Sequence, residues 1–340
     1  MRGRRQHSAT ARITSGEERM RAVRYALVLM LAAMTAPLCA QTYPSKPIRL
    51  VNPFPAGGPA DAVVRPIAQR LSETTKVQWV VDNRAGVNGL LGSEIAVRAQ
   101  ADGYTLLIGS TSSLPMNAAI VARMPFDLLK DLAPVSAFTH TPQVMVVHPS
   151  VPAKTVKELI ALGRARQGQL VYATPGVGSS PHFAAEMFSS ATGVKMLHVP
   201  YRGGALVIPD IMSGRVMLYF GSLQNLIQHV RANRLRALGM ASLKRIQAAP
   251  DIPTIAESGL PGYEVNLMFG LFAPAGTPRE IVRTLHGEVV RVLATPDVRE
   301  RLINDGAEVI GNSPEEFAAY MSSETTKWAK VARDAGIKAE

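Results

Sequence analysis

Residues 48–61 read IRLVNPFPAGGPAD, and this stretch decides the fold class. It opens with a short apolar run, Ile48–Asn52, which Pro53 closes. A turn rich in glycine and proline follows, and apolar residues then recur at helical spacing along one stripe, at Val63, Val64, Ile67, Ala68 and Leu71. The stretch therefore predicts a buried strand, a glycine-rich loop and a helix, in that order.

The same alternation continues to the end of the chain. We expect further strands at residues 77–81, 105–108, 143–147, 170–173, 195–199, 216–220 and 235–240. Capping-box patterns at Thr155-x-x-Glu158 and Ser313-x-x-Glu316 predict two helix starts. Further helices are expected at residues 89–99 and 278–293. Strands alternating with helices predict an α/β protein with largely parallel sheets flanked by helices.

Composition narrows the function classes. The chain has 340 residues, of which 47% are hydrophobic and 19% charged, as in packed proteins with room for two domains. The net charge is +11, but residues 1–40 hold much of the excess, with seven arginines against two glutamates. No dense run of lysine and arginine follows, so nucleic acid is excluded as a partner, whereas a small anion suits the modest surplus.

The first forty residues are typical of a secretory signal peptide. An apolar run, residues 25–36, follows a basic stretch that includes Arg24, and a small residue, Ala40, precedes Gln41. Because the segment before this run is long, Met20 is an alternative start to Met1. Cys39 also permits a lipoprotein, but the residues before it are a poor lipidation context. Cleavage after Ala40 leaves an exported, periplasmic chain without cysteine and therefore without thiol chemistry or a cysteine metal site.

Two glycine-rich loops have the character of anion sites. The first is PFPAGGPAD, residues 53–61, and the second is ATPGVGSSPH, residues 173–182; each lies between a strand and a helix. In α/β sheets ligands lie beyond the carboxyl ends of strands, where free N–H groups at helix starts accept an anion. Two such loops, one in each half of the chain, predict a clamp.

The sequence lacks complete motifs for nucleotide binding, for serine hydrolase catalysis or for metal binding. Gly176-x-Gly178-x-x-Pro181 lacks the third glycine of a dinucleotide fingerprint, and neither a Walker lysine nor a Gly-x-Ser-x-Gly elbow is present. No histidine pair has metal-ligand spacing, so neither a metal nor another cofactor is expected. We expect structural roles for His148, His198 and His286. His182, inside the second loop, lines a cleft or supports the fold, and Asp61 caps a helix or orients the first loop.

Ten ordered motifs resemble the Bug family, the TctC-like receptors of tripartite tricarboxylate transporters. They are YPSKPIRLVNPFPAGG (43–58), DNRAG (82–86), DGYTLL (102–107), PSVPAKT (149–155), GVGSSPH (176–182), HVPYRGG (198–204), LRAL (235–238), PDIPT (250–254), GLPGY (259–263) and FAPAGTP (272–278). The resemblance covers the chain from Tyr43 to its end.

The resemblance implies a two-lobed periplasmic-binding-protein fold of type II-like form, with two crossing strands joining the lobes. After a signal peptide, residues 1–40, lobe 1 would comprise residues 41–142 and 267–340, and lobe 2 residues 143–266. The crossings would fall near residues 141–145 and 265–269. In this family a ligand carboxylate lies between the lobes, held by backbone N–H groups and waters of two strand-to-helix loops.

Carried over residue by residue, the family's site comprises five groups. The first loop supplies Phe54, Pro55, Ala56, Gly57 and Gly58, followed by Asp61; the second supplies Thr174, Gly176, Gly178 and Ser179, followed by His182. The Ser110-Thr111 turn, Tyr201 and Gly203 with their neighbours Arg202 and Gly204, and Gly221 with Ser222 would complete the lining. The family usually continues its first loop as Gly-Thr-Asp or Gly-Ser-Asp, whereas here Pro59 and Ala60 precede Asp61.

Both lines of reasoning predict a receptor that closes by a hinge on a small organic acid: a di- or tricarboxylate, an acidic amino acid or an aromatic acid. Delivery to the membrane permease of a tripartite transporter is expected, and the resemblance implies a monomer. One alternative is a ligand-sensing partner of a membrane sensor kinase. Another is an exported hydrolase or lyase that uses Ser179 and His182.

Overall fold

The computed structural model describes residues 43–338, so the predicted signal peptide lies outside the described residues. Ten strands form one sheet of order β2-β1-β3-β9-β4-β7-β5-β6, with β8 and β10 also paired to β4. The strands are β1 (Ile48–Asn52), β2 (Trp79–Asn83), β3 (Thr105–Ser110), β4 (Leu132–Val147), β5 (Leu170–Thr174), β6 (Met196–Pro200), β7 (Leu218–Ser222), β8 (Arg236–Met240), β9 (Asn266–Pro274) and β10 (Glu308–Val309).

Helices follow most strands, as the alternation predicted. They are α2 (Pro59–Thr75), α3 (Leu90–Val97), α4 (Asn117–Ile120), α5 (Val156–Ala165), α6 (Ser180–Thr192), α7 (Gly204–Met212), α8 (Leu223–Arg231), α9 (Arg279–Leu293), α10 (Pro296–Asn304) and α11 (Pro314–Ala335), with short turns η1 (Val87–Gly89) and η2 (Ser112–Met116). Both capping patterns form: Thr155 accepts from the Glu158 N–H, and Ser313 and Glu316 make a reciprocal box.

The sheet is mixed rather than largely parallel. β1 pairs in parallel with β2 and β3, and β5 with β6 and β7, as strand–helix–strand units require. The two long strands differ, since β9 is antiparallel to β3 and to β4, and β4 is antiparallel to β7 and β8. The two parallel sets are the largely parallel sheets that the sequence predicted, and the long strands that join them into one sheet are antiparallel to their neighbours.

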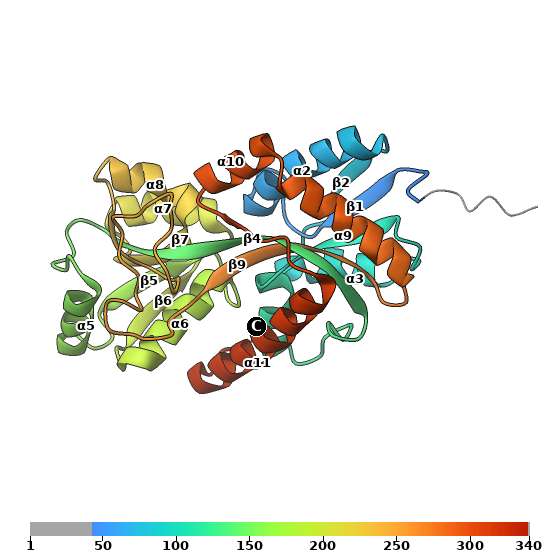
Figure 1. Ribbon diagram of the computed structural model, residues 1–340. Helices are drawn as coiled ribbons and strands as arrows, with labels where there is room; N and C mark the ends of the chain where they lie inside the picture. The colour runs from blue at the N-terminus through green and yellow to red at the C-terminus, as the bar shows by residue number, and fades with distance from the viewer. Residues whose placement is uncertain (1–42, 339–340) are drawn as a thin grey trace, which may run out of the picture. The chain divides into compact units, whose positions relative to one another are not determined.

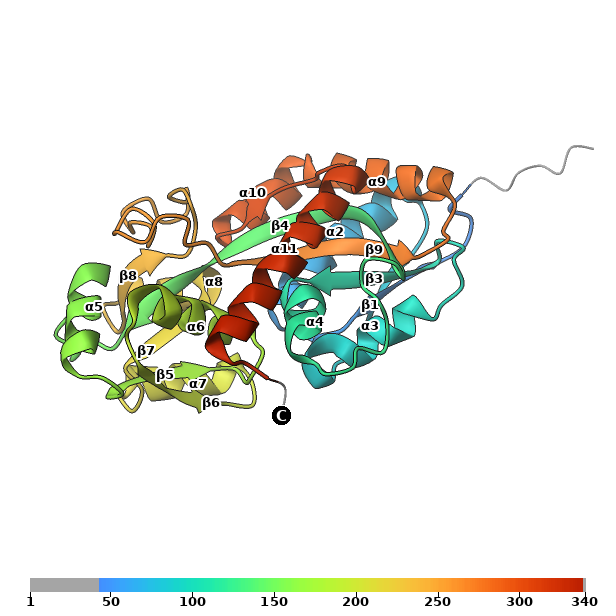
Figure 2. The same ribbon diagram turned by 90° about the horizontal axis from the view of Figure 1, so that it is seen from below.

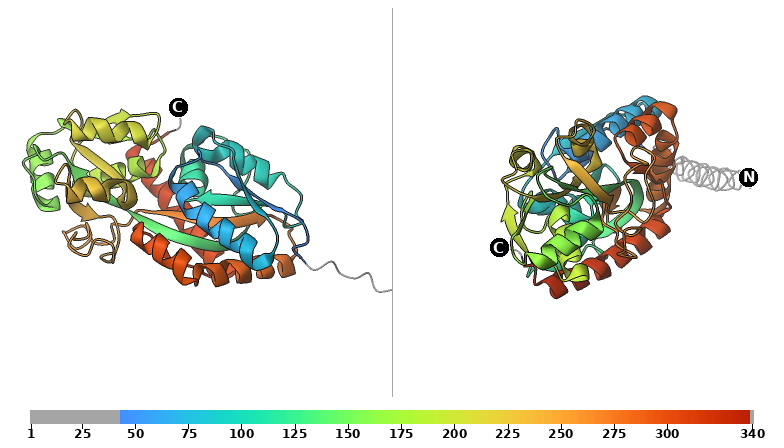
Figure 3. Two further views of the ribbon diagram at one scale, coloured as in Figure 1. Left: turned by 90° about the horizontal axis from the view of Figure 1, so that it is seen from above. Right: turned by 90° about the vertical axis from the view of Figure 1, so that its left-hand side faces the viewer.

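β4 is the strand that divides the sheet into halves. Its residues up to Pro142 pair with β9, and from Gln143 it pairs with β7 and β8. We call β1, β2, β3, β9, β10 and this first part of β4 the first half-sheet, and β5 to β8 with the rest of β4 the second half-sheet. Figures 1 and 3 show β4 and β9 running side by side between the halves. The change of partner falls inside the crossing that the sequence predicted at residues 141–145.

Each half-sheet has its own core on both faces. In the first half, α2 and α9 cover one face and α3 with the start of α11 covers the other. α11 then continues onto the second half (Figure 2). Phe317, near its start, packs on Phe272 of β9 with ring centroids 4.7 Å apart, whereas Trp328 packs on Phe183 of α6 at 5.3 Å. The end of α11 thus packs with the second half, although the sequence assigned all of residues 267–340 to lobe 1.

Candidate functional site

The two predicted loops end in the same backbone conformation. We call residues 53–58, before α2, the first loop, and residues 174–179, before α6, the second loop. Each ends in a left-handed glycine followed by an extended N-cap residue: Gly57 (φ +77°) before Gly58, and Gly178 (φ +76°) before Ser179. A left-handed residue at this point favours glycine, because a Cβ there meets the following carbonyl.

A side chain in the first turn of each helix accepts from that glycine. Asp61 Oδ2 accepts from the Gly57 N–H at 2.9 Å. His182 Nδ1 accepts from the Gly178 N–H at 3.2 Å. In both cases the acceptor is the third residue of its helix and lies four positions after the glycine. Asp61 and His182 therefore hold the loops from beneath, through backbone groups.

Asp61 is a buried carboxylate with a full set of donors. Besides the Gly57 N–H it accepts from Arg65 Nε at 2.6 Å, Asn83 Nδ2 at 3.0 Å and Asn52 Nδ2 at 3.2 Å. Burial alone raises the pKa of Asp61, but the hydrogen bonds from Arg65, Gly57 and Asn83 outweigh it and hold the pKa below its ordinary value. Of the two roles that the sequence left open for Asp61, the structure shows the orienting one.

His182 lies in a stack of aromatic rings under the second loop. Its ring packs on that of His198 with centroids 4.2 Å apart and planes 12° apart, and the near-parallel Tyr172 ring has its centroid 4.8 Å from that of His198 and 6.5 Å from that of His182. Burial, with a smaller contribution from His198, lowers the pKa of His182 to about 4. A neutral ring is what the geometry requires, because only an unprotonated Nδ1 accepts a hydrogen bond.

The rest of the second loop rests on the same stack. Thr174 Oγ1 lies 2.6 Å from His198 Nε2 and 3.2 Å from the Gly176 N–H, which donates to it. Ser179 Oγ donates to the Gly176 carbonyl oxygen at 2.7 Å. The neighbouring strand end contributes backbone contacts, since the Tyr201 N–H donates to Thr174 O at 2.9 Å and the Gly203 N–H to Pro175 O at 3.0 Å.

Backbone N–H groups remain free at both helix starts. Neither α2 nor α6 has a side-chain cap, and each carries a proline in its first turn. Among residues 43–338, the N–H groups of Ala60 and Asp61 in α2, and of Ser180 and His182 in α6, donate no hydrogen bond. Such groups carry partial positive charge, and they suit a carboxylate or phosphate oxygen.

Beneath the second loop lie polar atoms without partners. Gln143 of β4 and Ser222 of β7 oppose each other across a strand ladder, and Gln143 Nε2 donates weakly to Ser180 Oγ at 3.4 Å. Gln143 Oε1 and Ser222 Oγ are buried with no partner within the described part of the chain. The sequence named Ser222 but missed Gln143 and Ser180. The available signal was a glutamine inside the run 143–147, where the neighbours are apolar.

One asparagine links the two half-sheets at these loops. Asn88 Nδ2 donates to the Gly178 carbonyl oxygen at 3.2 Å and to Asn117 Oδ1 at 2.9 Å. Its neighbour Gly89 is close to the first loop, since a Cβ there would lie 3.4 Å from Pro53 and 3.6 Å from the Phe54 ring. The structure therefore brings the two loops together through residues 88–89, a connection that the sequence did not indicate.

Several of the other residues predicted to line the site make hydrogen bonds or packing contacts within the protein. Ser110 Oγ bonds to Ser112 Oγ and Ser113 Oγ, and Thr111 Oγ1 donates to Asn266 O of β9 at 3.0 Å. Phe54 packs edge-on against Phe269, while Pro55 and Ala56 are exposed. A ligand contact for these residues stays a prediction.

Two further predicted residues belong to strand ends. Tyr201 donates through its hydroxyl to Asp210 Oδ2 at 2.6 Å, and Arg202 is exposed. Gly221 permits close packing inside the second half-sheet, because a Cβ would come within 2.5 Å of the Tyr219 ring. Their contact with a ligand also stays a prediction.

A nucleophile–base pair is not assembled at the second loop. The Ser179 hydroxyl donates to Gly176 and the His182 Nδ1 accepts from Gly178, so the two side chains do not bond to each other. Within residues 43–338 there is also no group of three or more His, Cys, Asp or Glu side chains that could hold a metal ion.

Comparison with known proteins gives the family. Residues 63–337 match the model of the tripartite tricarboxylate transporter family receptor, TctC. The chain belongs to this family. Protein BugT of Bordetella pertussis is 33% identical to it over 92% of the chain and 96% of BugT. The resemblance to the Bug family is confirmed.

Solved TctC-type structures share the fold. The R. palustris protein Rpa4515, solved with adipate, is 36% identical and superposes with a TM-score of 0.79 over 87% of this chain and 99% of its own. MatC from Rhodopseudomonas palustris, solved with bound malate, is 29% identical, with a TM-score of 0.76 over 85% and 99%. The periplasmic-binding-protein fold is therefore confirmed, and the TctC-family receptors are periplasmic binding proteins. No helix in the described part of this chain is long and apolar enough to cross a bilayer.

The structure shows where Pro59 and Ala60 lie, the two residues at which this chain departs from the first-loop pattern of the TctC family. The Ala60 side chain is 1% exposed and packs in the core of the first half-sheet with Val64 and Ile67. Pro59 occupies the first helical position, where the missing N–H costs nothing. At position 60 this family member therefore has no hydroxyl beside its first loop.

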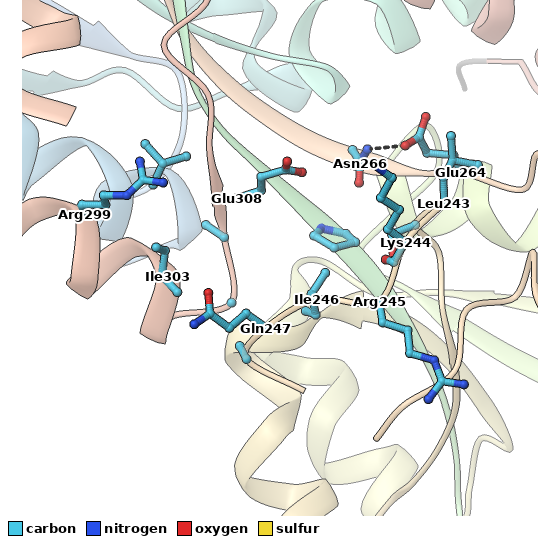
Figure 4. Close-up of a pocket in the computed structure, with 16 residues that line it drawn as sticks. Leu243, Lys244, Arg245, Ile246, Gln247, Glu264, Asn266, Arg299, Ile303 and Glu308 are labelled. Atoms are coloured by element: carbon cyan, nitrogen blue, oxygen red, sulfur yellow. Dashed lines mark hydrogen bonds between the residues drawn. The ribbon is translucent and has the colours of Figure 1, made fainter. Parts of the chain in front are cut away.

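A cavity of about 490 Å³ lies elsewhere in this TctC-family fold. Figure 4 shows Arg299 and Glu308 on one side of it and Lys244, from residues 242–248, on the other. Pro142 of β4 lines it, whereas the adjacent Gln143 reaches Ser180, and neighbouring strand residues point to opposite faces. The cavity thus lies behind the crossing strands and includes no residue of either loop, so it is separate from the candidate site at the loops.

Proposed function

We propose that the protein captures a small organic carboxylate between the first and second loops and delivers it to the membrane permease of a tripartite tricarboxylate-type transporter. Capture occurs outside the cytoplasmic membrane, after export directed by residues 1–40. The protein acts by binding and not by catalysis.

The observation that carries this proposal is the pair of uncapped helix starts. The free N–H groups of Ala60 and Asp61 come from one half-sheet and those of Ser180 and His182 from the other. An anion with two oxygens can satisfy both sets at once without a side-chain cation. The adipate and malate held by two solved relatives are anions of this kind.

Closure would follow from the two-part sheet. We propose that two lobes, built on the two half-sheets, turn about β4 near Pro142 and Gln143 and about β9 near Asn266. An acid that contacts both loops stabilises only the arrangement in which the loops face each other. The bond from Asn88 to Gly178 supports this, because it joins the halves at the second loop.

A thermal-shift and calorimetry screen tests the proposal. The purified protein is unfolded first and what it releases is identified, so that a co-purified ligand is not mistaken for an empty site. The refolded protein is then screened with adipate, malate, aromatic acids and acidic amino acids, each beside its amide. A ligand at one hundred times its dissociation constant adds about 2.7 kcal/mol of stability.

The expected result is a raised melting temperature with at least one acid and none with its amide. Equal shifts with acid and amide would contradict the anion clamp. Absence of any shift and of any released acid would overturn the proposed function.

A further inference from the structure

The two loops differ in the chemistry of the group that supports them. The first rests on Asp61, a carboxylate that Arg65, four residues later on α2, pairs with at 2.6 Å. The second rests on His182, and the residue four positions later on α6 is Glu186, which accepts from the Tyr172 hydroxyl. A carboxylate at position 182 would therefore have Glu186 four residues later on its helix, where Asp61 has Arg65.

We propose that neutral His182 is a positioning residue that fixes the second loop for carboxylate binding through the Gly178 N–H. The inference rests on the proposed function. The residue does this without touching the ligand through its side chain, whereas the sequence counted it among the ligand contacts.

The geometry gives the Nδ1 atom of His182 a defined partner. Nδ1 accepts a hydrogen bond from the Gly178 N–H, which is thereby directed toward α6. The Gly178 carbonyl oxygen accepts from Asn88 Nδ2. His182 is 7% exposed, and its ring lies against those of His198 and Tyr172, with centroids 4.2 Å and 6.5 Å away. The titratable groups around it are thus His198 on β6 and Tyr172 on β5, with Glu186 bound to Tyr172.

An uncharged acceptor suits this place. A second carboxylate under the loop would repel the bound acid, and at 182 it would lack the arginine that neutralises Asp61. A cationic ring would lose the acceptor itself. Imidazole in its neutral form is the side chain that satisfies both conditions while filling the stack.

Two amides of different length test the proposal. In His182→Asn the side-chain amide oxygen is bonded to Cγ, as Nδ1 is in histidine. It therefore keeps an acceptor for the Gly178 N–H. In His182→Gln the amide lies one bond further out, where Nε2 was, and leaves the Gly178 N–H without its partner. Affinity for the acid found in the screen should fall by no more than about threefold in His182→Asn and by about tenfold or more in His182→Gln.

Hydrogen exchange of the Gly178 amide, measured on the free protein, does not depend on any ligand. It should be slow in the wild type and His182→Asn and faster in His182→Gln. The matched controls are His286→Asn and His286→Gln on α9, outside the site, which should alter neither readout.

Equal affinities of the two His182 variants, with equal exchange at Gly178, would overturn the proposal. Failure of the wild type to bind any acid would instead overturn the proposed function, and the exchange measurement would still decide the role of His182. A variant that does not fold would show as a lost thermal transition, and the other amide then supplies the comparison with the wild type.

Discussion

Asn88 and Gly178 are ninety positions apart in the sequence, and the side-chain amide of the first donates to the carbonyl oxygen of the second at 3.2 Å. Asn88 belongs to the turn before α3, in the first half-sheet, and Gly178 ends the second loop. Asn88 has φ +48°, a conformation that asparagine tolerates better than most residues. The bond therefore depends on both the residue type and the turn that presents it.

Asn88→Gly should weaken ligand binding without disturbing the turn. Glycine accepts the positive φ, so the substitution keeps the backbone and removes the amide with its bonds to Gly178, Asn117 and Ser112. Loss of one hydrogen bond between the halves corresponds to about fivefold in affinity. Calorimetry with the bound acid measures it, and Asn233→Gly, at an exposed asparagine with φ +54°, is the matched control. An unchanged affinity in Asn88→Gly would remove this bond from the closed arrangement.

Gly178→Ala should cost both stability and binding. A Cβ at Gly178 would lie 2.3 Å from Ile120 Cδ1, so either the Ile120 side chain or the loop has to move. The left-handed backbone adds about 1–2 kcal/mol for any L-residue. Gly193→Ala is the control, because Gly193 has φ +70° and no atom within 4 Å of the added Cβ.

Thermal melting and acid titration of the Gly178→Ala and Gly193→Ala variants separate the two effects. Both variants should lose stability, but only Gly178→Ala should lose affinity. Parallel loss of affinity in Gly193→Ala would mean that the left-handed strain alone, and not the contact with α4, governs binding.

Local signals in the sequence were sufficient for the elements that frame the site. The strand Ile48–Asn52 forms with the predicted bounds, and both predicted capping residues accept the expected N–H. These features depend on residues within a few positions of each other. The two loops were located for the same reason, since strand, glycines and helix are contiguous.

The features that could not be predicted from the sequence depend on contacts between residues far apart in the chain. β4 was predicted only from Gln143, because Pro134, Thr139 and His140 interrupt the apolar pattern before it; yet the strand begins at Leu132, where β9 pairs with it. Asn88 carries no local pattern that marks a site, and the signal at Gln143 is only that of one polar residue in an apolar run. Their roles come from Gly178 and Ser222, residues that only the folded chain brings to them.

Gly58→Asp should abolish carboxylate binding while leaving the fold intact. Gly58 is the N-cap of α2 with φ −81°, so a side chain is accepted there, and a Cβ would lie 3.3 Å from the Pro55 carbonyl oxygen. Aspartate is a favoured N-cap, so the melting temperature should not fall by more than a few degrees. Its charge would occupy the N–H groups of Ala60 and Asp61 and repel the acid.

Gly58→Asn separates charge from size, because it has the same shape without the charge. Affinity should rank wild type first, then Gly58→Asn, with binding by Gly58→Asp undetectable in calorimetry. Equal weakening in both variants would indicate steric exclusion rather than charge at the first loop.

Acid should destabilise the protein through His182. Burial lowers its pKa to about 4, whereas an unfolded chain has a histidine pKa of about 6.5. Between these values the unfolded state binds a proton that the folded state does not, so the free energy of unfolding falls as the pH drops from about 6.5 to about 4. The pKa difference corresponds to about 3 kcal/mol.

Urea unfolding at about pH 7 and about pH 4.5 measures this loss in the wild type and in His182→Asn, which has no ring to protonate. The variant should lose less stability between the two conditions. Part of the loss should remain, because burial also lowers the pKa of His140, on β4 against Tyr320, to about 4. Identical losses in wild type and variant would mean that folded His182 takes up its proton in the same pH range as the unfolded chain, and the bond from the Gly178 N–H would then not hold the ring neutral.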